Sequence, residues 1–148
     1  MSMTEPLRKD HEILRQQLEA LEAELQAVPT ATASVQQLCH SLACFVEGHM
    51  AKEEQMFAPY AHRFGPGVRR HLLGDHTDEW MLLHELDMLF TSNIRVPTSE
   101  LVTRLGQLVE QLRDHLDLEE RSVFPVIDRA EQEMARRVRA GAAGDTGT

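Results

Sequence analysis

The sequence predicts an all-α protein that folds as an up-down antiparallel four-helix bundle. Four segments of roughly 20 to 30 residues carry apolar residues at three-and-four spacing, which is typical of helices with one buried face. Short segments rich in Pro, Gly, Ser and Thr separate them, and only 5% of the residues are aromatic. Helices of this length joined by short links pack as antiparallel neighbours. With 148 residues, the chain is expected to form a single domain.

The first two helices are expected at about residues 5 to 27 and from about Ser34 to Pro59. In the first, Thr4 provides an N-cap and Pro6 lies in the first turn, where a missing backbone N–H costs little. Its apolar stripe consists of Leu7, Leu14, Leu18, Leu21 and Leu25. In the second, Ser34 and Gln37 form a possible capping box before the next stripe. That stripe consists of Leu38, Leu42, Phe45, Val46, Met56 and Phe57.

The third helix is expected at about residues 68 to 91, and the fourth from Thr98 or Ser99 to Pro125, with a possible continuation beyond the proline. The third stripe is Leu72, Trp80, Leu83, Leu86 and Phe90; the fourth is Leu101, Leu105, Leu108 and Leu112. The small, polar ending "GAAGDTGT" predicts a disordered tail. We therefore expect a domain over residues 1–140 and a disordered tail over residues 141–148.

Composition argues against several classes of partner. A formal net charge of -9, with no large basic cluster, argues against nucleic-acid binding. No apolar run approaches the roughly eighteen residues of a membrane helix, and the N-terminus lacks an apolar signal core, so we expect a cytoplasmic protein. Cys39 and Cys44 lie five residues apart on one helix and point to different sides. They are expected to be reduced thiols in the core.

One phrase occurs twice, as "HMAKEEQMFAP" from His49 and as "HLDLEERSVFP" from His115. In both copies a glutamate, Glu53 or Glu119, follows the histidine by four residues and so lies on the same helix face. These pairs continue the apolar stripes of the second and fourth helices, where leucines would be expected. The first and third stripes each contain one histidine as well, at positions 11 and 76.

These polar residues predict a metal centre inside the bundle. Counting residues from the turns places them at similar heights, because an α-helix rises about 1.5 Å per residue. Two buried carboxylates without an inward Lys or Arg are costly unless cations neutralise them. Four imidazoles and two carboxylates exceed the needs of one zinc ion and suit two ions of non-haem iron, with manganese or zinc as possible substitutes. The predicted ligands are His11, His49, Glu53, His76, His115 and Glu119.

Other polar residues have plainer interpretations. Glu79, three residues after His76, could be an extra ligand but is expected to be solvated; Glu54 and Glu120 are expected to support the ligands or face solvent. Tyr60 could gate the site or hold a water molecule. The remaining histidines are expected to have surface or capping roles: His40, His62, His71 and His84.

The segments "KDHEIL", "HMAKEEQMFAP", "GDHTDEW" and "HLDLEERSVFP" resemble the hemerythrin-like, or HHE cation-binding, domain family in its bacterial single-domain form. The resemblance implies that the same six residues hold a non-haem di-iron centre, oxo- or hydroxo-bridged, with the two carboxylates bridging. Two departures argue against reversible oxygen storage. Trp80 stands where the oxygen carriers have a second histidine, and Glu119 follows its histidine by four residues where they have Asp at five.

The resemblance leads us to expect a di-iron protein that binds, senses or responds to dioxygen, nitric oxide or peroxide, or supplies iron for repair. Such a role is more consistent with a metal-binding protein than with an enzyme. One alternative is a di-iron enzyme that reduces peroxide or nitric oxide. Another is a metal-free helical scaffold whose acidic surface binds a partner. The sequence does not predict the oligomeric state.

Overall fold

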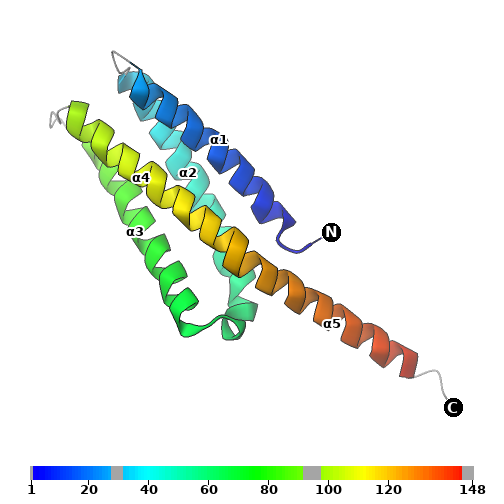
Figure 1. Cartoon of the computed structure of the whole chain (residues 1–148). Helices are drawn as coiled ribbons and strands as arrows, with labels where there is room; N and C mark the ends of the chain where they lie inside the picture. Colours follow the sequence, from blue (N-terminus) through cyan, green and yellow to red (C-terminus); the bar gives the residue numbers. More distant parts are fainter. Residues whose placement is uncertain (1, 28–31, 92–97, 145–148) are drawn as a thin grey trace.

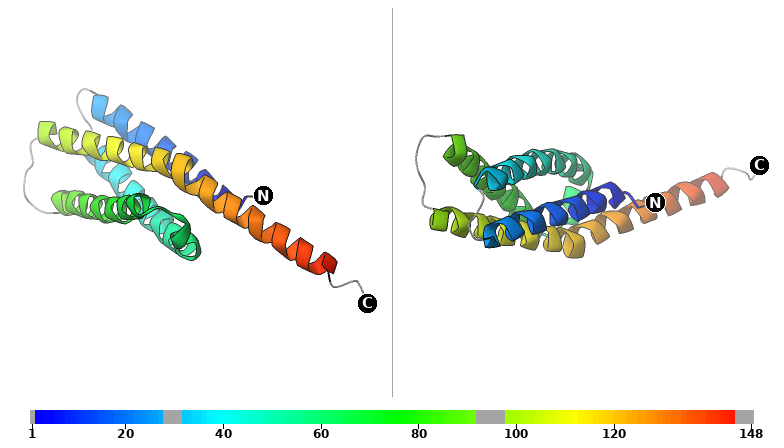
Figure 2. Two further views of the ribbon diagram at one scale, coloured as in Figure 1. Left: turned by 60° about the horizontal axis from the view of Figure 1, so that its bottom comes forward. Right: turned by 90° about the horizontal axis from the view of Figure 1, so that it is seen from above.

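A computed structural model describes residues 2–27, 32–91 and 98–144, and this part of the chain is helical almost throughout. The elements are α1 (Glu5–Gln26), α2 (Thr32–Phe57), the 3₁₀ helix η1 (Ala58–Arg63), α3 (Pro66–Thr91), α4 (Thr98–Leu118), the π-helical turn η2 (Glu119–Val123) and α5 (Phe124–Gly144). The first four α-helices run alternately up and down beside one another, and α5 continues the direction of α4 beyond the bundle (Figures 1 and 2). The prediction of an all-α bundle is confirmed.

Two apolar clusters form the interior, one on each side of a polar layer. The larger cluster is built mainly from apolar side chains of α1, α2 and α4. The smaller cluster lies toward the other end and is rich in aromatic residues. Along α1, Leu7 belongs to the smaller cluster and Leu14 to the larger, with His11 between them. The polar layer is therefore closed off from solvent along the bundle axis by mainly apolar side chains.

The predicted helix boundaries are close to the observed ones, but the beginning of α1 differs in its contacts. Thr4 occupies the N-cap position without a side-chain capping hydrogen bond. Its Oγ1 instead donates to Asp128 Oδ1 of α5, at 2.9 Å. α2 begins at Thr32 rather than Ser34, and α3 at Pro66 rather than residue 68. Differences of this size are usual where helices end.

The fourth predicted helix continues past its proline through a π-helical turn. The backbone N–H of Phe124 donates to the carbonyl of Glu119, five residues earlier, instead of to a carbonyl four residues earlier. Pro125 has no backbone N–H and its ring crowds the preceding turn, so a regular α-helix is disfavoured at this point. One wide turn accommodates the proline, and the helix resumes as α5.

The C-terminal prediction differs from the structure over four residues. α5 extends to Gly144 and so includes residues 141–144, which the sequence assigned to a disordered tail. Ala142 and Ala143 are strong helix formers, and a single glycine such as Gly141 costs a helix only about 1 kcal/mol. The rest of the predicted tail, residues 145–148, lies outside the described residues. Within the described residues, every helix is too short or too polar to cross a bilayer.

The two cysteines are both free, but only Cys39 is a core thiol. Cys44 is exposed, so the prediction of two core thiols is wrong for this residue. Five residues along an α-helix correspond to a rotation of about 140°, which turns Cys44 away from the face that buries Cys39. Burial raises the pKa of the Cys39 thiol to about 12.

This difference predicts selective alkylation. At neutral pH, iodoacetamide should modify one thiol per folded chain, because Cys39 is buried and protonated. Both thiols should react once the chain is unfolded. Intact-mass and peptide mass spectrometry would show whether the first label is on Cys44. Equal labelling of Cys39 in the folded chain would contradict the structure.

Candidate metal centre

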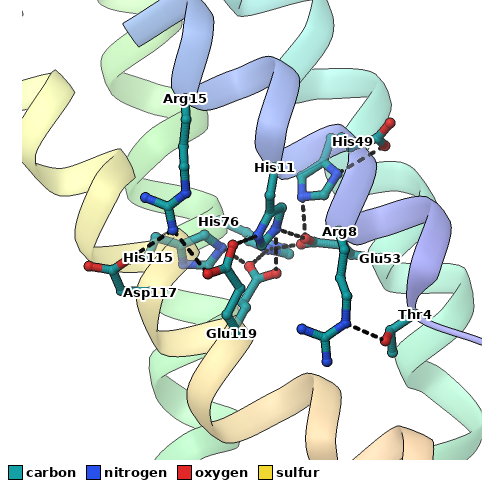
Figure 3. A network of polar contacts seen from close by, with 12 residues as sticks. Thr4, Arg8, His11, Arg15, His49, Glu53, His76, His115, Asp117 and Glu119 are labelled. Carbon is teal, nitrogen blue, oxygen red and sulfur yellow. Dashed lines mark hydrogen bonds and ion pairs between the residues drawn. The ribbon is translucent and has the colours of Figure 1, made fainter. Parts of the chain in front are cut away.

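All six predicted ligands meet in the polar layer, and each is buried. His11 comes from α1, His49 and Glu53 from α2, and His76 from α3. The other two are His115 at the end of α4 and Glu119 at the start of the π turn. Figure 3 shows their side chains converging between the helices. Each predicted height and facing was correct, because the 3.6-residue period that places leucines inward also places these residues inward.

The donor atoms form two groups that share both glutamates. One group is His11, His49, Glu53 and Glu119; the other is Glu53, His76, His115 and Glu119. In each group one donor atom per residue lies within 4.8 Å of all the others. A carboxylate has two oxygens, so a shared glutamate can offer one oxygen to each of two cations. The arrangement has room for a pair of ions with two carboxylates between them.

Contacts across the layer bring each imidazole to a shared carboxylate. Nε2 of His11 lies 3.4 Å from Glu119 Oε2 and 3.7 Å from Glu53 Oε1. Nε2 of His76 lies 2.9 Å from Glu53 Oε2 and 3.9 Å from Glu119 Oε1. Within the repeated phrase, the Nε2 atoms of His49 and His115 contact the glutamates four residues later. All four Nε2 atoms therefore face the shared carboxylates.

The donor set is chemically suited to cations. Both oxygens of Glu53 and of Glu119, and Nε2 of His11, His49 and His76, are buried and find no hydrogen-bond partner among the described residues. A buried polar atom without a partner is costly, and a buried carboxylate more so. Bound metal ions would satisfy these atoms together. Imidazole nitrogens and carboxylate oxygens are the ligands typical of non-haem iron, manganese and zinc.

The pKa values show how strongly this layer attracts positive charge. Burial alone would lower the pKa of His11 and His76, but contacts with Glu119 and Glu53 outweigh it and raise both values to about 9. Burial would raise the pKa of Glu53, yet the histidines that face it hold this pKa well below its usual range. In the metal-free protein, protons on His11 and His76 therefore supply neutralising charge. Metal ions must displace these protons.

A second set of carboxylates contacts the other ring nitrogen of each histidine. Nδ1 of His11 is 3.0 Å from Glu120 Oε1, and Nδ1 of His49 is 3.2 Å from Asp10 Oδ2. The remaining two contacts are longer: His115 Nδ1 to Glu79 Oε1 at 3.6 Å and His76 Nδ1 to Glu54 Oε1 at 4.0 Å. A carboxylate at Nδ1 keeps Nε2 free to bind metal and fixes the direction of the ring.

The outer carboxylates explain why both copies of the phrase contain two adjacent glutamates. The first glutamate of each pair faces the centre, and the second faces Nδ1 of a histidine on a neighbouring helix. On the α1 side, cations hold the outer carboxylates in place. Arg15 contacts both Glu120 and Asp117, and Lys52 contacts Asp10 at 2.9 Å (Figure 3 shows Arg15 and Asp117).

Comparison with known proteins agrees with this geometry. Residues 2–127 match the family model described as the hemerythrin HHE cation binding domain.

The chain belongs to the hemerythrin HHE cation-binding family. The match covers every residue of the polar layer and all of the bundle up to the start of α5. No curated protein and no solved structure gave a significant match. Membership of the family supports cation binding, and the two His/Glu groups are where this HHE domain could hold the ions.

Three residues near the layer differ from their predicted placement. Glu79 is 1% exposed rather than solvated, because three residues after His76 it turns toward α4 and His115. Trp80 is 51% exposed rather than inward, and its ring stacks on His84. Tyr60 is buried and its hydroxyl donates to Met3 Sδ, so it belongs to the apolar end and not to the centre.

Asp10 is a contributor that the sequence argument missed. It directly precedes His11 in "KDHEIL" and looks like an ordinary charged residue of a helix beginning. Its role depends on α2, where it meets both His49 and Lys52. One feature of the sequence could have indicated this role: Asp10 is adjacent to a predicted ligand. It also lies on α1, which packs directly against α2.

We expect Asp10→Asn to weaken metal binding by about 10- to 100-fold, as is typical when an outer partner of a metal-bound histidine is changed. The amide can present its NH₂ group to His49 Nδ1, which favours the wrong tautomer for binding through Nε2. Competition with a coloured chelator would measure the affinity. Glu12→Gln, a change of an exposed carboxylate on α1, is the matched control. Equal affinities in the two variants would contradict the assigned role.

The HHE domain is most open to solvent beside His76. The side chain of His76 is 10% exposed, compared with 1% for His11, 3% for His49 and 4% for His115. A cavity of about 270 Å³ reaches His76 from the η1 side, lined mainly by Phe57, Ala58, Ala61 and Phe64. A second hollow of about 230 Å³ is also lined by Glu54 and His76, together with Met50, Thr77 and Trp80. Small molecules could reach the layer by this face.

Proposed function

We propose that this HHE domain holds a non-haem di-iron centre that binds or senses dioxygen, nitric oxide or peroxide, or supplies iron for repair. His11 and His49 would hold one ion, and His76 and His115 the other. Glu53 and Glu119 would lie between the ions. The sharing of both glutamates by the two donor groups is the observation that carries the proposal.

Two features favour iron at this centre. Each ion would receive two imidazoles and oxygens from two shared carboxylates, which is fewer than the six donors that iron accepts, so a small ligand has room. The donors include no thiolate, the ligand type that structural zinc sites usually prefer. Manganese and zinc fit the same donors and remain substitutes. The iron pair would supply redox chemistry, while the protein holds the ions and excludes bulk water.

The apolar cavity beside His76 supports a small, weakly hydrated ligand. Its lining of phenylalanine and alanine side chains offers few polar partners, so dioxygen and nitric oxide would enter it at little cost. Glu54 and Arg69 lie at the same cavity and bring one charge of each sign. The α2–α3 face is therefore the proposed route to the centre.

Anaerobic titration with ferrous iron followed by exposure to air or nitric oxide tests the proposal. We expect uptake of two ions per chain and, on oxidation, the near-ultraviolet charge-transfer absorption of coupled ferric ions. A spectrum that does not change with air, peroxide or nitric oxide would exclude the redox role, even if two ions bind. Uptake of two zinc ions with no stable binding of iron would indicate a redox-inert metal protein.

A further inference from the structure

A groove between α2 and α3 gathers metal-binding side chains that are separate from the six ligands of the centre. It has a volume of about 180 Å³. His40, Cys44 and Glu47 line it from α2, while Trp80, His84 and Asp87 line it from α3. None of these residues belongs to either donor group of the di-metal centre.

His40 and Cys44 are already placed as a pair of ligands. They lie four residues apart on α2, and residues at this spacing share one helix face. His40 Nε2 is 3.9 Å from Cys44 Sγ. With zinc bonds of about 2.0–2.1 Å to nitrogen and 2.3 Å to sulfur, two ligands in a tetrahedron lie roughly 3.5 Å apart. The observed separation needs to shorten by only a few tenths of an ångström, and both side chains are exposed enough to adjust.

The α3 wall provides a third ligand and an orienting carboxylate. The His84 ring stacks on Trp80, with ring centroids 5.2 Å apart and planes 5° apart, which holds the imidazole at the groove. Asp87 Oδ1 lies 4.0 Å from His40 Nδ1. A carboxylate on that side of the ring favours binding of metal through Nε2, the nitrogen that faces Cys44.

We propose that this groove is a second, mononuclear metal site that binds Zn²⁺ through Cys44, His40 and His84. The fourth position is open to Glu47 or water. One thiolate and two imidazoles suit zinc and are unlike the carboxylate-rich donors of the central layer. Binding displaces the thiol proton of Cys44 to the solvent and links α2 to α3.

Cobalt titration of the full-length chain tests this site, because Co²⁺ can replace Zn²⁺ and a cobalt–thiolate bond gives a near-ultraviolet charge-transfer band. The central layer contains no cysteine, so the band reports the groove alone. In Glu53→Gln, whose central layer is expected to bind no ions, we expect the band to saturate at one cobalt per chain. In this variant and in the unmodified chain, the band should disappear when Zn²⁺ is added. Zn²⁺ should also protect Cys44 from iodoacetamide.

Matched variants test whether the cobalt band arises from the groove, and not from the central layer or from the loss of any exposed histidine. Cys44→Ser should remove the band, and His40→Ala and His84→Ala should each weaken cobalt binding by more than the roughly 100-fold upper range for outer partners. His62→Ala, which changes an exposed histidine in η1, and Glu53→Gln should leave the band unchanged. Absence of the band in the unmodified chain, its survival in Cys44→Ser, or full affinity in His84→Ala would overturn the proposal.

Discussion

Glu53→Gln is expected to abolish binding of both metal ions, whereas His49→Ala is expected to leave one ion bound. Glu53 belongs to both donor groups, and His49 belongs to only one. An amide oxygen is a weaker ligand than a carboxylate, and the substitution also removes the negative charge that makes the layer attractive to cations. The glutamine side chain has nearly the same shape, so the effect on packing should be small.

Metal analysis after dialysis, together with calorimetric titration, would give the number of ions bound by each variant. Glu12→Gln is the matched control, since it makes the same change at an exposed glutamate of α1. It should retain both ions. Loss of a single ion in Glu53→Gln would mean that the carboxylate is not shared. Unchanged folding stability with and without metal in all variants would favour the metal-free scaffold.

The stability of the metal-free protein is expected to fall between about pH 6.5 and pH 9, while that of the metal-loaded protein is maintained. The folded-state pKa of His11 and His76 is raised from 6.5 to about 9 by the shared carboxylates. A raised pKa stabilises the fold fully below the unfolded value of 6.5, and this contribution is lost as pH rises through 9. Metal ions bind the deprotonated imidazoles, so their affinity rises over the same range.

Thermal unfolding followed by circular dichroism, with Mn²⁺ as an air-stable probe and with a chelator, would measure both curves. The Tm of the metal-loaded protein should exceed that of the metal-free protein by more at higher pH, because the affinity for metal rises as the imidazoles lose their protons. Each ion present at about 1,000 times its Kd contributes roughly 4 kcal/mol to the free energy of unfolding. His62→Ala should follow the unmodified chain. His11→Gln combined with His76→Gln should lose most of the pH dependence of the metal-free form. If the Tm values of the metal-loaded and metal-free proteins differed by the same amount at pH 6.5 and at pH 9, this account would be contradicted.

The six central residues could be found from the sequence because each continues an apolar helical stripe. A periodic pattern reports which way a side chain faces, and a polar residue inside that pattern is therefore conspicuous. Glu53 is the clearest example, since it follows Leu42 and His49 on the same face of α2. The fold and the heights of the ligands depend on this same regularity, which is why both were predicted together.

The third helix was harder to interpret because its inward face is less regular. Trp80 and Glu79 are adjacent, and assigning the aromatic residue to the interior placed the carboxylate outside. The structure reverses this assignment: Glu79 reaches His115, while Trp80 packs on His84 at the surface. The contact of Asp10 with His49 was also not predictable from one helix, because it depends on how α1 and α2 are turned toward each other.

The π turn makes two buried residues depend on each other. In a regular α-helix, Glu119 and Phe124 would point about 140° apart, so one of them would leave the interior. With bonding to the fifth residue, five positions make roughly one turn, and both side chains face inward. If this stretch became a regular α-helix, for example after removal of Pro125, either Glu119 would leave the charged layer or Phe124 would leave the aromatic packing at the far end. A single irregular turn thus couples the geometry of the centre to the base of the projecting helix.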